Sequence, residues 1–207
     1  METQDNVYAP PRASLTQEAA EPSGLPPFHV VSITKLVLLY VATFGFYSLY
    51  WFWKHWSQHK RDKKLDIWPV PRAIFAIFFA NSLNQEIDHR LRRSGKHHSW
   101  SPGMWAGAYI MTAIGSRLIK RIPDAVLPPL PSFWVAMLVM ALNATALVQA
   151  QRAANLACGD PGGAGNSRLT VANWVWLVLG GLLWTSVFAL LAMHLGFWTP
   201  TVYLPAS

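Results

Sequence analysis

Two histidines four positions apart, His55 and His59, are the residues with the clearest potential for metal chemistry in this 207-residue chain. Residues at that spacing lie on one face of a helix, where two imidazoles could bind the same metal ion. Three further histidines lie in the same predicted loop, at His89, His97 and His98. A metal-dependent oxidase is therefore one hypothesis for the function.

The surroundings of the pair favour a simpler interpretation. His55 and His59 stand among lysines and tryptophans at the end of an apolar segment, a place that suits an amphipathic ring. Their spacing resembles one histidine box of the membrane di-iron hydroxylases and desaturases, but those enzymes combine several boxes and this chain has no second box of matching form. We therefore predict no catalytic residue, no cofactor and no metal, and keep His55 and His59 as the ligands to test.

The apolar segment before His55 indicates the environment of the protein. Residues 36–53 carry no charge, and as a helix they would be about 27 Å long, close to the roughly 30 Å hydrocarbon core of a bilayer. The segment ends in aromatic residues that prefer the headgroup region, among them Trp51, Trp53 and Trp56. The sequence therefore predicts a membrane protein whose first spanning helix covers residues 34–56.

The composition points the same way. Hydrophobic residues make up 52% of the chain and charged residues only 13%, against about 25% charged residues in average soluble domains. The net charge is +7 without a nucleic-acid-binding motif, so we interpret the excess of lysine and arginine as the bias that orients membrane proteins. The single cysteine, Cys158, excludes an intrachain disulfide.

Further apolar segments predict spanning helices at residues 103–119, 133–150 and 174–193. Over residues 72–93 apolar residues recur every three or four positions, which predicts an amphipathic helix on the cytoplasmic membrane surface. The expected fold is an all-α membrane protein with four transmembrane helices and this interfacial helix. The expected domains are a disordered tail (1–27), one transmembrane domain (28–198) and a short C-terminal tail (199–207).

The distribution of lysines and arginines predicts the orientation. With four spans, the loops after the first and third spans share one side, and they hold most of the basic residues. The positive-inside rule then places these loops in the cytoplasm and both termini outside it. We expect a multi-pass protein of the bacterial inner membrane. If residues 103–119 enter the membrane and return without crossing it, the orientation of the C-terminal half is reversed.

Two groups of side chains are predicted to contact lipid or other helices. Aromatic and basic residues near the membrane surface are assigned to lipid: Trp51, Trp53, Trp56, Phe75, Phe79, Arg90, Arg92 and Arg93. Glycines in small-residue stripes are assigned to helix packing: Gly103, Gly107 and Gly181. The predicted partners are the lipid bilayer with its anionic headgroups, and other membrane proteins or a second copy, but not nucleic acid.

The run TFGFYSLYWFWKHW, from Thr43 to Trp56, resembles the T-x-G-x-Y-x-x-Y-W-F-x-K-x-W signature of a group of uncharacterised small bacterial inner-membrane proteins. Residues 151–173 also resemble a polar loop that precedes their last helix. The resemblance implies an integral membrane protein without an established activity. We predict a small scaffold or interaction subunit; the alternatives are an oligomeric permease or channel-like component and the histidine-based oxidase.

Overall fold

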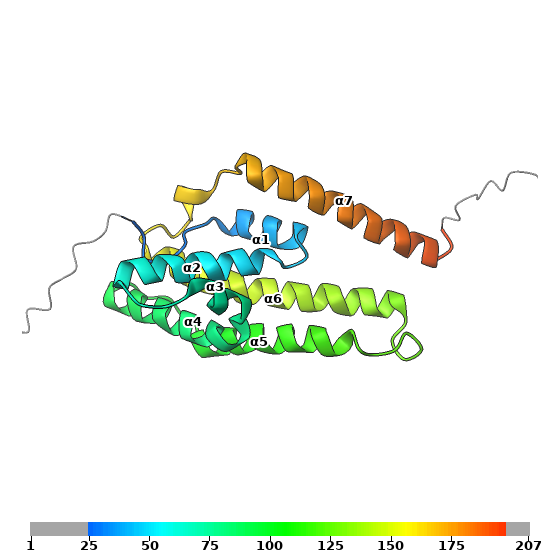
Figure 1. The fold of residues 1–207 in the computed structure, drawn as a ribbon, viewed down its shortest axis with the longest axis horizontal. Coiled ribbons are helices and arrows are strands. Elements are labelled where there is room, and N and C mark those ends of the chain that lie inside the picture. The colour runs from blue at the N-terminus through cyan, green and yellow to red at the C-terminus, as the bar shows by residue number, and fades with distance from the viewer. Residues whose placement is uncertain (1–24, 198–207) are drawn as a thin grey trace, which may run out of the picture.

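A computed structural model describes residues 25–197, and every regular element in that range is a helix (Figure 1). The elements in chain order are α1 (Ile33–Ala42), α2 (Tyr47–Lys63), α3 (Pro69–Ile74), α4 (Ala76–Arg93), α5 (Pro102–Ile119), α6 (Pro129–Ala157), the short 3-10 helix η1 (Ala164–Asn166) and α7 (Val171–His194). The two expected tails fall almost entirely outside the described residues.

The two ends of the molecule are packed differently (Figure 1). At one end α2, α4 and the C-terminal half of α6 form a compact bundle, with α3 beside α2. From this bundle, α5 and the N-terminal half of α6 continue as an antiparallel pair toward the other end. The last helix, α7, lies along the outside of the molecule and packs mainly on α1.

The first predicted span is not a single helix, so the prediction of a continuous span over residues 34–56 is wrong. Helix α1 ends at Ala42, and α2 begins at Tyr47 after a sharp turn. Two successive residues in the turn, Phe44 and Gly45, have positive φ angles of 52° and 87°. A right-handed helix cannot continue through left-handed residues, and the hydroxyl of Thr43 accepts a hydrogen bond from the Tyr47 amide at 2.9 Å. The segment therefore forms a helical hairpin (Figure 1).

The hairpin turns one face of α2 toward the alanine-rich half of α6. Trp51 and Trp56 are only 1% and 2% exposed, and Trp51 packs in the core among residues such as Ala146 and Ala150. Alanine side chains leave room for the large rings at this contact. The prediction that Trp51 and Trp56 lie at the lipid interface is therefore wrong.

The segment predicted as one interfacial helix, residues 72–93, divides into α3 and α4 at Phe75. Helix α4 packs on α5 and α6, and its apolar residues Leu83, Ile87 and Leu91 are buried in the protein core. Phe75, in contrast, is 54% exposed. The interfacial position is wrong for most of α4, because protein rather than lipid covers its apolar face.

Among the described helices, α6 and α7 are long and apolar enough to cross a membrane. Helix α5 matches the predicted segment 103–119 to within a residue, α6 extends beyond residues 133–150 at both ends, and α7 contains residues 174–193. Figure 1 shows α5, α6 and α7 reaching the same end of the molecule. A membrane protein is thus possible on these two candidate spans, and the prediction of four transmembrane helices is not confirmed.

The contact between α7 and the rest of the protein is small and specific. Gly180 is the only buried residue of α7, and a Cβ atom there would lie 2.2 Å from the carbonyl oxygen of Ala42. Trp184 donates a hydrogen bond from Nε1 to the carbonyl of Val41 at 3.0 Å and stacks on Phe44 with ring centroids 4.5 Å apart. The hairpin turn therefore positions α7.

Candidate functional site

Two amide side chains one turn apart in α6 form the centre of a buried polar cluster. Gln151 and Asn155 are both fully buried. The Gln151 Oε1 atom accepts a hydrogen bond from Trp51 Nε1 at 2.6 Å and lies 3.3 Å from His55 Nε2. The Nε2 atom of Gln151 donates a hydrogen bond to Asn155 Oδ1 at 2.7 Å. Residues at this spacing share a helix face, so the two amides are oriented by each other.

The cluster binds the backbone of the extended segment that precedes α1, residues 28–31. Gln151 Nε2 donates to the carbonyl of His29 at 2.8 Å. Asn155 forms two bonds to Val31, donating to its carbonyl at 2.9 Å and accepting from its amide at 3.3 Å. Asn166 Nδ2 donates to the carbonyl of Val30 at 3.0 Å. Side chains of α6 and the following loop thus satisfy backbone groups that lie outside any helix.

The loop between α6 and α7 is joined to the same segment. Lys35 donates from Nζ to Asn166 Oδ1 at 2.7 Å and to the carbonyl of Arg168 at 2.8 Å. Gly163 has a φ of 65°, and a Cβ atom there would lie 2.4 Å from the carbonyl oxygen of Val31. Within the loop, Asp160 accepts bonds from the amides of residues 164 and 165, which hold the pKa of its carboxyl below the usual value.

The histidines singled out by the sequence lie inside the protein. His55 and His59 are 0% and 2% exposed, so the interpretation that they lie at the membrane interface is wrong. Their partners differ: His55 faces Gln151, whereas His59 Nε2 lies 3.6 Å from Glu86 Oε2 and stacks on Phe28. Within residues 25–197, no group of three His, Cys, Asp or Glu residues is placed to hold a metal ion.

Burial keeps the histidines next to this cluster neutral. Desolvation, together with the charges of Lys54 and Lys35, lowers the pKa of His29 to about 4. Desolvation and the neighbouring Lys63 also lower the pKa of His59, although Glu86 opposes the shift. Neutral imidazoles that have at most one polar neighbour pack as aromatic rings, and His29 meets His55 edge to face at 5.9 Å. The cluster is therefore built to hold residues 28–31 in place rather than to activate a nucleophile.

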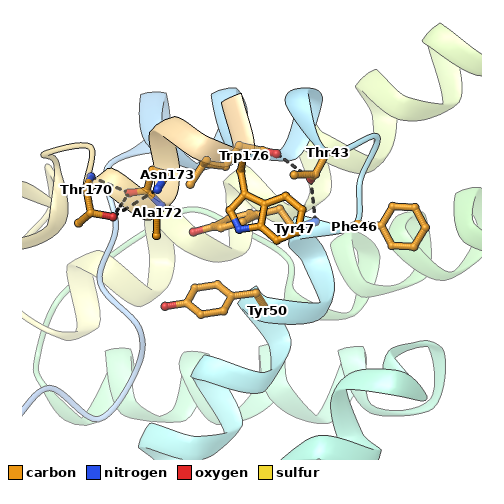
Figure 2. A pocket seen from close by; sticks show the side chains of 9 residues that line it. Thr43, Phe46, Tyr47, Tyr50, Thr170, Ala172, Asn173 and Trp176 are labelled. Atoms are coloured by element: carbon orange, nitrogen blue, oxygen red, sulfur yellow. Dashed lines mark hydrogen bonds between the residues drawn. The ribbon is translucent and has the colours of Figure 1, made fainter. Parts of the chain in front are cut away.

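A cavity of about 350 Å³ lies between the α1–α2 hairpin and the start of α7 (Figure 2). Figure 2 shows the rings of Tyr47, Tyr50 and Trp176 around it, with both tyrosine hydroxyls directed toward the end formed by Thr170 and Asn173. The Asn173 side chain is already hydrogen bonded, because it and Thr170 form a capping box at the N-terminus of α7. Most of the cavity surface is apolar, and its polar lining residues include Thr43 besides the two tyrosines, Thr170 and Asn173.

The remaining residues assigned to lipid have mixed environments. Trp53 is 37% exposed and lies under the Lys54 ammonium, and Phe75 is exposed on the outside. Phe79 is half-buried against the Arg72 guanidinium, which lies 4.9 Å from its ring centroid. Lipid contact at these positions stays a prediction.

The three arginines assigned to lipid are exposed at the C-terminal end of α4. Arg92 pairs with Asp88 at 2.7 Å, and Arg90 lies 3.9 Å from Asp62. Arg93 is exposed beside them. Positive charge at a helix C-terminus also complements the helix dipole.

Of the three glycines assigned to helix packing, none makes a tight contact within the described residues. A Cβ atom at Gly103 would lie 3.9 Å from Asn81 Oδ1, and one at Gly107 or Gly181 would meet nothing within 4 Å. The tight contacts are at Gly180 and Gly163 instead. Asn143, however, does bond across helices, from Nδ2 to the Thr112 hydroxyl of α5 at 3.1 Å.

Sequence reasoning did not find the amide cluster. Its signal is the pair Gln151 and Asn155, two amides four apart among the alanines of residues 150–157. A polar pair on an otherwise small and apolar helix face marks a place where neighbouring chain segments must supply hydrogen bonds.

Comparison of the chain with models of protein families, with curated proteins and with solved structures finds no match.

Proposed function

We propose that this protein is an integral protein of the bacterial inner membrane that acts as a scaffold or interaction subunit rather than as an enzyme. The observation that carries the proposal is the environment of α7. This helix of 24 residues has no charged Asp, Glu, Lys or Arg and exposes tryptophan, leucine and phenylalanine side chains around its circumference. A helix that is apolar on all sides needs a lipid or protein environment.

The arrangement of charges supports a topology for this protein. The C-terminal ends of α2 and α4 each carry three basic residues in the last turn. They lie together at one end of the molecule, as the ion pairs from Lys63 to Glu86 and from Arg90 to Asp62 require. We place this end in the cytoplasm by the positive-inside rule. Helices α5, α6 and α7 then cross the membrane, and the α1–α2 hairpin enters and returns.

This topology keeps the C-terminal end of α7 outside the cytoplasm, as the sequence analysis expects. It moves residues 25–32 to the cytoplasmic side, because the hairpin replaces one crossing. Exposed apolar residues of α3 and its neighbours, including Trp68, Val70 and Ile74, are at the depth where the hairpin enters and would contact the lipid interface. The interfacial role assigned to residues 72–93 is thus kept only for Phe75 and the residues beside it.

The proposed interaction role is based on the face of α7 that is exposed and does not pack on α1. Gly181 and Thr185 are exposed and four apart, on a helix whose only buried residue is Gly180. Small residues at that spacing let a second helix approach closely within a membrane. We propose that this stripe is the contact for a partner helix.

Fusions and site-specific photo-crosslinking test the proposal. A phosphatase fused after Ser207 should be active, and a fluorescent protein fused before Met1 should fluoresce. A photo-reactive residue at Thr185 should give one adduct of defined mass in native membranes, whereas one at Met111, exposed on α5, should not. An inactive phosphatase contradicts the topology, and identical crosslinking at the two positions contradicts the interaction role.

A further inference from the structure

A groove between α1 and α6 combines an apolar wall with a cationic end. It has a volume of about 450 Å³, within the roughly 300–1,000 Å³ range of small-molecule sites. Val37 and Val41 of α1 form one side, and Ala141 and Ala144 of α6 form the other. The short alanine side chains keep the groove open, and Ala141 is exposed in it.

The charged and amide side chains of this groove lie toward one end, and the hydroxyl of Thr145 in its middle donates a hydrogen bond to the carbonyl of Ala141. Arg152 lines that end, with Gln149 one turn before it on the same helix. The Arg152 side chain is exposed, and no carboxylate of residues 25–197 forms an ion pair with it. A guanidinium without a carboxylate partner is suited to bind a phosphate through two parallel hydrogen bonds.

The length of the groove matches one leaflet of a bilayer. Its lining on α6 runs from Met140 to Arg152, about 18 Å along a helix axis, slightly more than half of the roughly 30 Å hydrocarbon core. Arg152 follows directly after the apolar segment 133–150, so on the proposed topology it lies at the cytoplasmic headgroup level. Its charge and the apolar wall are therefore at the depths of a lipid phosphate and of an acyl chain.

We propose that this groove binds one anionic phospholipid of the cytoplasmic leaflet, with its phosphate on Arg152 and one acyl chain between α1 and α6. Gln149 is placed to donate to an ester carbonyl. The lipid would fill the space that α1 and α6 leave between them and so would hold the hairpin against the crossing helices. The inference rests on the proposed membrane location.

The test uses the full-length protein, purified in mild detergent and stripped of lipid. Native mass spectrometry would measure the binding of phosphatidylglycerol and of phosphatidylcholine with the same acyl chains. Arg152→Gln removes the charge, and Ala144→Trp fills the groove. The matched controls are Arg61→Gln, at an exposed arginine of α2, and Ala136→Trp, at an exposed alanine of α6 outside the groove.

The wild-type protein and both controls should retain one phosphatidylglycerol per chain and prefer it to phosphatidylcholine. Arg152→Gln should weaken phosphatidylglycerol binding about tenfold, the effect expected from losing a charge-assisted hydrogen bond, and Ala144→Trp should abolish it. Equal binding by Arg152→Gln and Arg61→Gln overturns the proposal, whether or not Ala144→Trp folds.

Failure of the lipid site is distinguishable from failure of the membrane assignment. A protein that is extracted from cell membranes only by detergent, but binds both lipids equally in all variants, lacks the site and keeps the membrane location. A protein recovered by alkaline carbonate without detergent contradicts the membrane location itself.

Discussion

Helices α6 and α7 are both long and apolar enough to cross a membrane, yet the protein surrounds them very differently. Of the most apolar stretch of each helix, 22% is buried in α6 and only 6% in α7. The C-terminal half of α6 is covered by α1, α4 and the segment before α1, and its buried amides are hydrogen bonded. In α7, one glycine makes the close contact.

The difference separates two kinds of information in an apolar helix. The overall apolarity of a helix indicates whether it needs a lipid or protein environment, and the sequence of α7 carries little information beyond this. Individual polar or small residues describe contacts with protein, and α6 carries these at Gln151, Asn155 and its alanines. The comparison predicts that substitutions in the C-terminal half of α6 unfold the core, whereas substitutions in α7 mainly release that helix.

The largest expected effect is at the centre of the amide cluster. Gln151→Leu leaves Trp51 Nε1 and the carbonyl of His29 without partners in a buried site, and it removes one of the two hydrogen bonds to Asn155 Oδ1. Each buried unsatisfied group costs about 1–3 kcal/mol. We expect a loss of about 4 kcal/mol in the free energy of unfolding, measured by denaturant titration in detergent. Gln149→Leu, at the half-buried neighbour, is the control and should cost far less. Equal losses would contradict a structural role for the cluster.

A slightly smaller effect should appear on acidification. The pKa of His29 is lowered to about 4 in the folded protein, against 6.5 in the unfolded chain, so the unfolded state binds more protons between these values. Stability is therefore full above pH 6.5 and falls as the pH decreases toward 4, by about 3 kcal/mol for this group. Melting temperatures measured from pH 7.5 to 4.5 should fall steeply. His29→Gln should make the melting temperature less dependent on pH. If the variant has the same pH dependence as the wild type, groups other than His29 cause it.

In α7 the expected effect is confined to one face. Gly180→Ala places a Cβ atom 2.2 Å from the Ala42 carbonyl, and overpacking of this kind costs about 1–3 kcal/mol. The helix should separate from α1, which protease cleavage in the 158–170 loop and quenching of Trp184 would report. Gly181→Ala, one position on, meets no atom within 4 Å and should behave as wild type. If both variants loosen α7, the specific contact is wrong.

The smallest effect is at His59. His59→Gln removes the stacking on Phe28 and the proximity to Glu86, and it should cost about 1 kcal/mol of stability. The exposed His97 supplies the control, as His97→Gln. Metal analysis of the purified wild-type protein would test the other hypothesis for this residue. A bound iron or zinc that is lost in His59→Gln would revive the oxidase interpretation.

The sequence predicted helix locations better than helix connections. The segments 103–119 and 174–193 lie within or close to α5 and α7, because long runs of apolar residues without breakers leave few alternatives to a helix. The turn at Thr43–Phe46 was missed, although Gly45 is part of it. A single glycine is compatible with a continuous helix, and only the hydrogen bond of Thr43 and the stacking of Phe44 on Trp184 decide for the turn.

The side-chain roles were harder to predict than the helices. Trp51 and Trp56 have the composition of a membrane-interface belt, and Leu83, Ile87 and Leu91 have the period of a lipid-facing helix. Both patterns equally describe a face covered by protein, and periodicity does not say which neighbour covers it. The sequence pointed to Gly181 and not to Gly180, the glycine in tight contact with α1, because small residues alone do not define the angle at which two helices meet.

By itself the sequence determined that the chain is helical, that α6 and α7 are apolar enough to cross a membrane, and where its positive charges are concentrated. These properties depend on local composition and period, which are read along one segment at a time. Only the tertiary structure decided that residues 34–56 fold back, that His55 and His59 are buried, and that Gln151 and Asn155 bind residues 28–31. The bonds from His55 to Gln151, and from Gln151 and Asn155 to residues 28–31, join residues more than 90 positions apart, and their energy exists only when both partners are in place.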